Sequence, residues 1–121
     1  IQLEPGYIYV APADYHLLFE QGGTLSLDSS EKINYSRPSI DVAFESAAEV
    51  YGKRVTAILL SGANADGTNG MIAVQREGGR LVIQSPETAG MPFMPRHAIE
   101  NIKMREVMDV GQLLSLLNRL T

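Results

Sequence analysis

The sequence predicts an α/β domain with a doubly wound, mainly parallel sheet, helices on both faces and one added β-hairpin. Stretches typical of strands alternate along the chain with stretches of helical periodicity, which is the signature of βαβ units. The run from Val55 to Leu60 is apolar without alternation, as in a strand that is covered on both faces. The chain has 121 residues, enough for one domain and not two. We therefore expect residues 1–121 to form a single unit.

The first elements expected are a strand and a hairpin. Residues 6–12 are rich in aromatic and β-branched side chains and end at Pro12, which predicts a strand. Two short apolar runs, 17–19 and 24–27, flank a Gln-Gly-Gly segment at 21–23. Glycine supplies the positive φ that tight turns need, so these runs predict the two strands of a hairpin.

The strongest helix signal covers residues 39–51. Ser39 is a suitable N-cap, Asp41 sits favourably in the first turn, and Gly52 is a typical stop. The apolar residues recur on one face of this helix: Ile40, Ala43, Phe44, Ala47, Ala48 and Tyr51.

The second half of the chain predicts alternating helices and strands. We expect helices at 68–77, 95–101 and 112–120, and strands at 55–60, 80–84 and 105–110. The last helix is expected to turn four leucines toward the core: Leu113, Leu114, Leu116 and Leu117.

Composition excludes several classes of function. The net charge is −4 and no Lys/Arg cluster exists, so neither nucleic acid nor an anionic membrane surface is an expected partner. The chain has no cysteine, which excludes disulfides, thiolate metal sites and a cysteine nucleophile. The lack of cysteine also fits the expectation of a cytoplasmic protein. No apolar run is long enough to span a bilayer and no signal peptide is visible, so membrane insertion is not expected. Because the chain starts at Ile1 and not Met, we expect it to be processed, trimmed or cut from something longer.

Ligand sites in parallel sheets lie beyond the carboxyl ends of the strands, which here points to the loops at 61–67 and 85–93. Asp66 stands among small residues that allow close approach. Its carboxylate is compatible with orienting a histidine, binding a metal or capping the helix that follows, and the cap is the commoner role.

Other candidates are less specific. His16 and His97 without cysteines or an acidic cluster are a weak metal signal. Arg37 is suited to binding an acidic group, or is a surface charge beside a helix start. Met91 and Met94 belong to a loop that lines an apolar site or fills a gap in the core. A simple triad would combine His16 and Asp66 with a serine, but none of the candidates stands in a Gly-x-Ser-x-Gly elbow: Ser36, Ser39, Ser61 and Ser85.

Four segments, in this order, resemble one bacterial family. Residues 7–16 read YIYVAPADYH and are similar to its Y-[IV]-APp-xx-H segment. Residues 37–44, RPSIDVAF, are similar to RPS-[IV]-D-xx-F. Residues 60–67, LSGANADG, are similar to L-[TS]-G-xxx-DG, and residues 94–99, MPRHAI, to MPR-x-AI. The chain thus resembles the catalytic domain of the chemotaxis protein-glutamate methylesterases (CheB).

The resemblance implies an enzyme that hydrolyses γ-glutamyl methyl esters on chemoreceptors and deamidates receptor glutamines. It implies a Ser-His-Asp triad without a cofactor, on a doubly wound α/β domain. Asp66 matches the triad aspartate, and the backbone N–H of Ala63 matches a donor to the oxyanion. Arg37 and Met94 are the candidates for substrate contact. The expected partners are the cytoplasmic helices of methylated chemoreceptors.

The chain also departs from the family. The family's nucleophile motif, G-[AS]-S-x-GG, and its catalytic-histidine motif, QH-[ML], are not found among the 121 residues, and neither is a receiver domain. Ala63 and Asn64 stand where the family often has Met and Gly, and Phe93 where it often has Gly. We therefore expect this chain to be inactive by itself, with a missing N-terminal fragment or a self-dimer as partner. The alternative is a non-catalytic, receptor-binding or regulatory remnant of the same domain.

Overall fold

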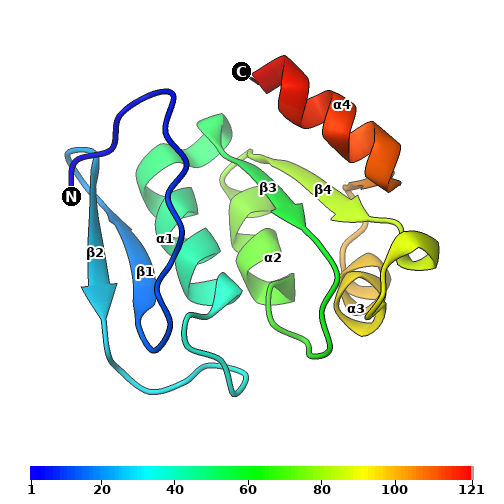
Figure 1. Cartoon of the computed structure of the whole chain (residues 1–121), viewed down its shortest axis with the longest axis horizontal. Coiled ribbons are helices and arrows are strands. Elements are labelled where there is room, and N and C mark those ends of the chain that lie inside the picture. Colours follow the sequence, from blue (N-terminus) through cyan, green and yellow to red (C-terminus); the bar gives the residue numbers. More distant parts are fainter. Residues whose placement is uncertain (121) are drawn as a thin grey trace.

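A three-stranded parallel sheet forms the centre of the computed structural model, which describes residues 1–120 (Figure 1). Its order is β3 (Thr56–Leu59), β4 (Arg80–Gln84) and β5 (Glu106–Met108). The central strand β4 is buried on both faces, because Leu81, Val82 and Ile83 are at most 3% exposed. The continuous apolar runs of the sequence thus lie where a covered parallel sheet needs them.

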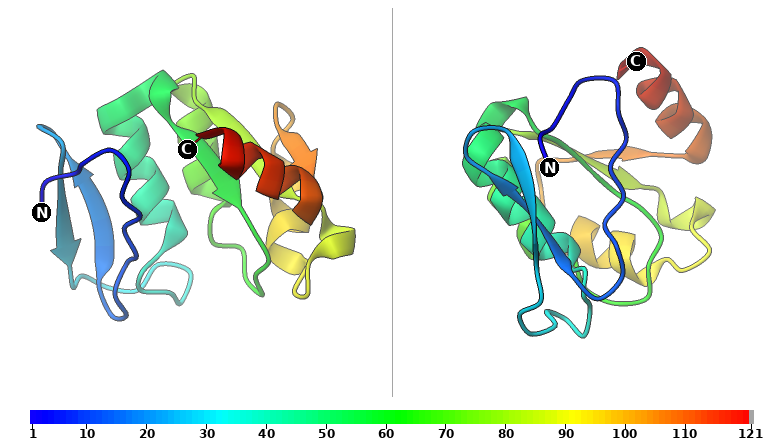
Figure 2. Two further views of the ribbon diagram at one scale, coloured as in Figure 1. Left: turned by 45° about the horizontal axis from the view of Figure 1, so that its top comes forward. Right: turned by 60° about the vertical axis from the view of Figure 1, so that its left-hand side comes forward.

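Helices cover both faces of this sheet (Figures 1 and 2). One face packs against α1 (Ile40–Tyr51), α2 (Thr68–Arg76) and α3 (Phe93–Asn101) in the larger core. The other face packs against α4 (Val110–Leu120) through a small cluster at Val82. The expectation of an α/β sheet with helices on both faces is confirmed.

The predicted hairpin is present as β1 (His16–Glu20) and β2 (Thr24–Asp28). Gly22 and Gly23 take φ values of 88° and 81° in its turn, a conformation that favours glycine. The hairpin packs against α1, where the rings of Phe19 and Tyr51 meet edge to face at 6.1 Å. It lies on the side of α1 away from the parallel sheet (Figure 2).

Helices α1 and α2 approach each other closely at a glycine. A Cβ at Gly70 would lie 2.7 Å from the Cβ of Phe44 and 3.0 Å from the Cα of Asp41. The absence of a side chain at Gly70 therefore brings the first turn of each helix within reach of the other.

The predicted strand at residues 6–12 is not formed. Tyr7, Ile8 and Val10 are 68%, 93% and 84% exposed, and the segment joins no strand ladder. Tyr9, Val10 and Pro12 instead line a groove beside the hairpin. The side chains favour a strand, but a strand needs a neighbour, and the free edge of β3 is not paired with this segment.

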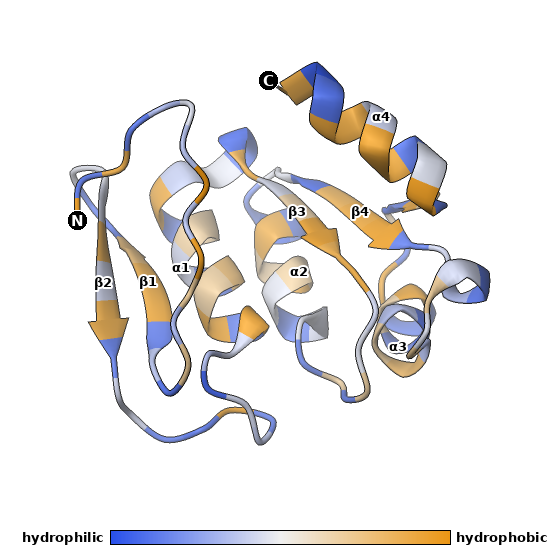
Figure 3. Cartoon of the chain, viewed as in Figure 1, coloured by the Kyte–Doolittle hydropathy of each residue, from blue (hydrophilic) through white to orange (hydrophobic). Residues whose placement is uncertain are grey.

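Two further expectations need correction. Leu113 and Leu116 are buried as expected, whereas Leu114 and Leu117 are 58% and 48% exposed, because one face of α4 meets the sheet and the other faces outward (Figure 3). Helix α3 begins at Phe93, two residues before the expected start, since a proline in the first helical turn removes an N–H that has no partner there. None of the helices described for residues 1–120 has the length and apolar composition that crossing a bilayer requires.

The contact at Gly70 yields a stability test. Gly70→Ala should lower the free energy of unfolding by about 1–3 kcal/mol, the usual cost of overpacking. Gly90→Ala is the matched control, because nothing lies within 4 Å of its added Cβ and the change should stay within about 0.5 kcal/mol. Urea denaturation of both variants measures the difference. Equal effects would contradict the close approach of α1 and α2.

Candidate functional site

The loops that follow β3 and β4 lie together at the carboxyl edge of the sheet. The N–H of Gly62 donates to the carbonyl of Met91 at 2.9 Å, and the N–H of Met94 donates back to the carbonyl of Gly62 at 2.9 Å. The hydroxyl of Ser61 accepts from the N–H of Met91 at 2.8 Å. These bonds make one wall of residues 61–67 and 91–94.

Asp66 is 2% exposed, and its carboxylate binds the N-terminus of α1. Oδ2 accepts the N–H of Ile40 at 2.6 Å. Oδ1 accepts three donors: the Ser39 hydroxyl at 2.8 Å, the Asp41 N–H at 3.2 Å and the Asn34 amide at 3.2 Å. The carboxylate therefore caps the helix that precedes it in the chain. The following helix, α2, begins after Gly67, an N-cap residue that has no side chain of its own to cap the helix.

Asp41, in the first turn of α1, makes the reciprocal contact. Its Oδ1 accepts the N–H groups of Gly67 and Gly70 at 2.9 and 2.7 Å, at the start of α2. Its Oδ2 accepts the amide of Asn34 at 2.8 Å, so Asn34 bridges the two carboxylates. Each helix thus receives at its positive end an acidic side chain that the other helix region supplies.

Local backbone geometry makes this exchange possible. Gly67 has φ +103°, and a Cβ there would lie 2.5 Å from Leu59 Cδ1, so only glycine fits directly after Asp66. Asn34 has φ 52°, a conformation that asparagine tolerates better than most residues. No pattern in the sequence points to Asn34, because its role appears only when the segments that carry Asn34, Asp41 and Asp66 meet.

His16 and Ser39 extend the network into the core, and each is 1% exposed. The N–H of Ser39 donates to His16 Nδ1 at 3.1 Å, and His16 Nε2 lies 2.8 Å from the carbonyl of Glu31. A backbone N–H can only donate, so Nδ1 is the acceptor and the ring proton is on Nε2. His16, Ser39 and Asp66 do meet, but the Ser39 hydroxyl donates to Asp66 and not to His16, which is not the wiring of a hydrolytic triad.

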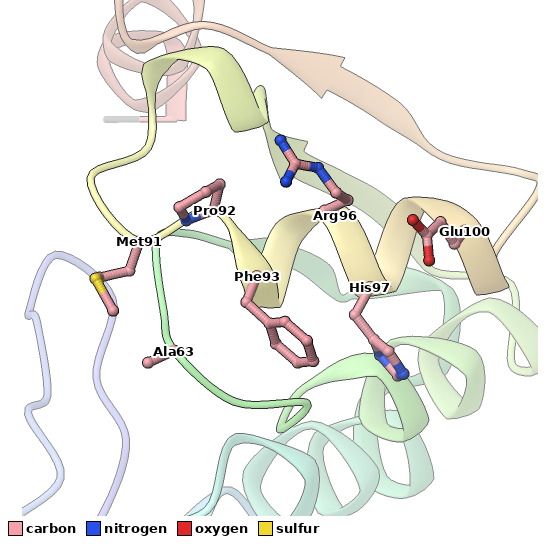
Figure 4. A pocket seen from close by; sticks show the side chains of 7 residues that line it. All are labelled: Ala63, Met91, Pro92, Phe93, Arg96, His97 and Glu100. Atoms are coloured by element: carbon pink, nitrogen blue, oxygen red, sulfur yellow. The ribbon is translucent and has the colours of Figure 1, made fainter.

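A pocket of about 230 Å³ opens beside Ala63 (Figure 4). The rings of Phe93 and His97 stack at 5.9 Å along it, and His97 Nδ1 lies 2.9 Å from the hydroxyl of Thr68. Within residues 1–120 no acceptor is found for the N–H of Ala63. The residues lining the pocket are Ala63, Met91, Pro92, Phe93, Arg96, His97 and Glu100.

The other two residues singled out from the sequence lie outside this pocket. Arg37 donates from Nη1 to the carbonyls of Ser29 and Ser30 at 3.2 and 3.1 Å, and its buried Nε has no partner among the described residues. Met94 is 7% exposed and packs on Gly62, where a Cβ would meet its Cε at 2.5 Å. Met94 thus supports the wall beneath Gly62, whereas Arg37 holds the loop at Ser29 and Ser30. Among residues 1–120 no group of three His, Asp or Glu side chains is arranged to hold a metal ion.

Comparison with known proteins identifies the family of the chain. The model of the CheB methylesterase family matches residues 1–117. The chain belongs to this family. A putative protein-glutamate methylesterase/protein-glutamine glutaminase of Leptospira interrogans is 43% identical over 119 residues, which cover 98% of this chain and 62% of the relative. The enzyme of that name from Thermotoga maritima is 39% identical over 102 residues, 82% of this chain and 30% of the relative.

The fold agrees with a solved member of the CheB family. The crystal structure of the Thermotoga maritima CheB methylesterase catalytic domain superposes with a TM-score of 0.92 at 34% identity. The match covers 100% of this chain and 66% of the solved chain. This chain therefore spans less than two thirds of the length of the Leptospira relative and about two thirds of the solved domain.

Charge at the site leads to a pH prediction. Burial raises the pKa of the Asp41 carboxyl above its ordinary value of 3.8, and the Asp66 carboxylate adds to the rise, although the Gly70 N–H opposes it. Between 3.8 and the raised pKa the folded state binds more protons than the unfolded chain. The contribution of Asp41 to the free energy of unfolding should therefore fall as pH rises through this window.

Urea denaturation at pH values on both sides of 3.8, compared between the wild-type chain and Asp41→Asn, measures that slope above 3.8 and the slope of the control below it. Asp28→Asn is the opposite-sign control: the Ser30 hydrogen bonds hold the Asp28 pKa below 3.8, so its contribution is lost as pH falls through the lowered pKa. Equal slopes for Asp41→Asn and the wild type would contradict the raised pKa of Asp41.

Proposed function

We propose that this chain is part of a protein-glutamate methylesterase and glutamine deamidase that acts on methylated chemoreceptors in the cytoplasm. In this proposal Asp66 is the acid of a Ser-His-Asp triad, and the serine and histidine come from a segment outside these 121 residues. The observation that carries the proposal is the fixed Asp66 carboxylate at the carboxyl edge of the sheet. Each carboxylate oxygen offers about two acceptor sites. Three donors share Oδ1 of Asp66, whereas Oδ2 accepts only the N–H of Ile40 among the described residues. One site of Oδ2 is left for an imidazole N–H.

The chemistry follows from these positions. A serine attacks the ester carbonyl of the glutamyl side chain while the histidine takes its proton, and methanol then leaves with a proton from the imidazolium. Asp66 holds the histidine in the productive tautomer and stabilises its charge. The free N–H of Ala63 donates to the oxyanion of the tetrahedral intermediate. Water repeats the sequence on the acyl-enzyme and releases the glutamate.

The pocket beside Ala63 is the proposed seat of the receptor segment next to the scissile ester. Phe93 and His97 form an aromatic wall, and Met91 and Arg96 stand at its rim (Figure 4). Arg37 and Met94, the substrate contacts expected from the sequence, would act indirectly. Arg37 holds the loop that carries Ser29 and Ser30, and Met94 packs beneath Gly62.

A binding role without catalysis is the second candidate. It is favoured by the burial of Asp66, which is 2% exposed and whose carboxylate already binds the N-terminus of α1. In that case the pocket beside Ala63 would recognise a receptor helix, and the charge of Asp66 would have a structural role only.

The two candidates predict different outcomes for Asp66→Asn. The experiment joins this chain to the part of the Leptospira relative that precedes the matched region, and measures methanol release from methylated receptor. Asp66→Asn should lower kcat by about 10⁴-fold, as in other triads in which asparagine fixes the wrong tautomer. Asp14→Asn is the control, because Asp14 is exposed and has φ 69°, which asparagine also tolerates.

Circular dichroism shows whether each chimera is folded. A folded chimera that releases no methanol, or one whose Asp66→Asn variant is as active as the parent, would reject the triad role and favour the binding module.

Exposed apolar surface supports a partner for the chain. Tyr7, Ile8 and Val10 are largely exposed, and β3 is an edge strand of the described sheet. Free strand edges beside apolar side chains are sites of association. We propose that the missing N-terminal fragment of the domain covers this surface, and that two copies of the chain cover it for each other when the fragment is absent.

Sedimentation velocity tests this association. The chain by itself should sediment as a dimer or larger species, and the fraction should rise with concentration. Ile8→Lys, which places a charge on the exposed apolar segment, should shift the distribution toward monomer. A compact monomer at every concentration would contradict the proposal.

A further inference from the structure

The buried polar network behind Asp66 contains no group that touches the substrate in the proposed reaction. It runs from the hairpin to the carboxylate through two side chains that are each 1% exposed, His16 and Ser39. Its hydrogen bonds are directional: the His16 ring receives the N–H of Ser39, and the hydroxyl of Ser39 donates to Asp66 Oδ1. Burying this many polar groups is unfavourable unless every donor and acceptor is paired. The loss of one partner in the network would therefore leave a buried polar group unpaired.

The network distinguishes the two oxygens of Asp66. Oδ1 accepts from Ser39, Asp41 and Asn34, whereas Oδ2 accepts only from Ile40 among the described residues. Turning the carboxylate out of this orientation would break the three bonds on its Oδ1 side, and only a half-turn, which exchanges two equivalent oxygens, would restore them. The Ser39 hydroxyl, at 2.8 Å, is the shortest of the three. The buried ring of His16 also holds Ser39 in place, because its Nδ1 accepts the N–H of Ser39.

We propose that Ser39, held in place by His16, is the positioning residue that fixes the orientation of the Asp66 carboxylate and leaves Oδ2 as the oxygen that meets the partner histidine. This inference rests on the proposed function for the identity of that partner, but the orientation itself is a property of this chain. Ser39 contacts no substrate. It acts through Asp66, as partners that orient a functional side chain do.

The position of His16 requires one protonation state. Its Nδ1 must stay unprotonated to accept the N–H of Ser39, and its Nε2–H then donates to the carbonyl of Glu31. Nitrogen NMR of the 121-residue chain reports this tautomer directly. Finding the proton on Nδ1 would overturn the proposal without any variant.

The first variant test uses amide NMR of the same chain. The charge-assisted bond of 2.6 Å from Ile40 to Oδ2 should place the Ile40 amide proton far downfield. Ser39→Ala should move that signal toward its ordinary position, and Ser39→Thr, which keeps the hydroxyl, should restore it.

Ser46→Ala is the matched control. Ser46 lies on α1, of which Ser39 is the N-cap, and it also uses its hydroxyl in hydrogen bonds. The hydroxyl accepts from the Phe19 N–H at 3.0 Å and donates to the Ala43 carbonyl at 2.9 Å, but it does not contact Asp66. It should leave the Ile40 signal in place even where it lowers stability as Ser39→Ala does. An Ile40 signal that moves equally in both variants would show a general loosening of α1 and overturn the positioning role.

The second test uses the chimera with the Leptospira segment. Ser39→Ala should lower kcat by about 10–100-fold with KM unchanged, the range seen when an orienting partner is removed. An unchanged kcat in an active chimera would overturn the inference. A chimera inactive in every form rejects the proposed function instead, and the orientation of Asp66 is then decided by the Ile40 signal.

Discussion

The exchange of two carboxylates between neighbouring helices is the contact on which the site depends. Asp66 receives the first N–H groups of α1, and Asp41 receives those of α2. The N–H groups of a helix's first turn have no partner within the helix, so each carboxylate satisfies donors that would otherwise be buried unpaired. Like charges at this proximity repel, and the bridging amide of Asn34 together with the two helix N-termini offsets that repulsion.

This arrangement joins structure and proposed chemistry in one group of atoms. The same bonds that pin α1 against α2 fix the direction of Asp66, so a change that weakens the packing of these helices also disturbs the carboxylate. Two glycines are needed for this arrangement. Gly67 allows the backbone to turn beside Leu59, and Gly70 allows α1 and α2 to touch. A functional side chain held by the core in this way is more precise than one carried on a mobile loop.

The sequence predicted those features whose causes are local. The Ser39 cap, the Gly52 stop and the hairpin turn depend on residues that lie within a few positions of one another, and each is present. Asp66 was expected to be a cap or a triad acid, and its helix partner could not be foreseen, since local rules assign a cap to the helix that follows. The strand expected at residues 6–12 is absent for another non-local reason. The composition favours a strand, but a strand forms only where a second strand is available to pair with it. In α4, residue type does not distinguish the buried Leu113 from the exposed Leu114, because both are leucines. Their exposure depends on which face of the helix meets the sheet.

The narrow attachment of α4 has a consequence for how the fold opens. Its buried contacts are confined to a cluster of Val82, Leu113 and Leu116, with Ile58 and Met108 at the margin, whereas α1, α2 and α3 share the larger core. Elements with few buried contacts are the first to detach in local, sub-global opening, so amides of α4 should exchange with solvent before those of α2. Its departure would uncover the Val82 face of the sheet while Asp66, on the other side, stays sealed. In such an opening one sheet face would be bare while the carboxylate network stays intact.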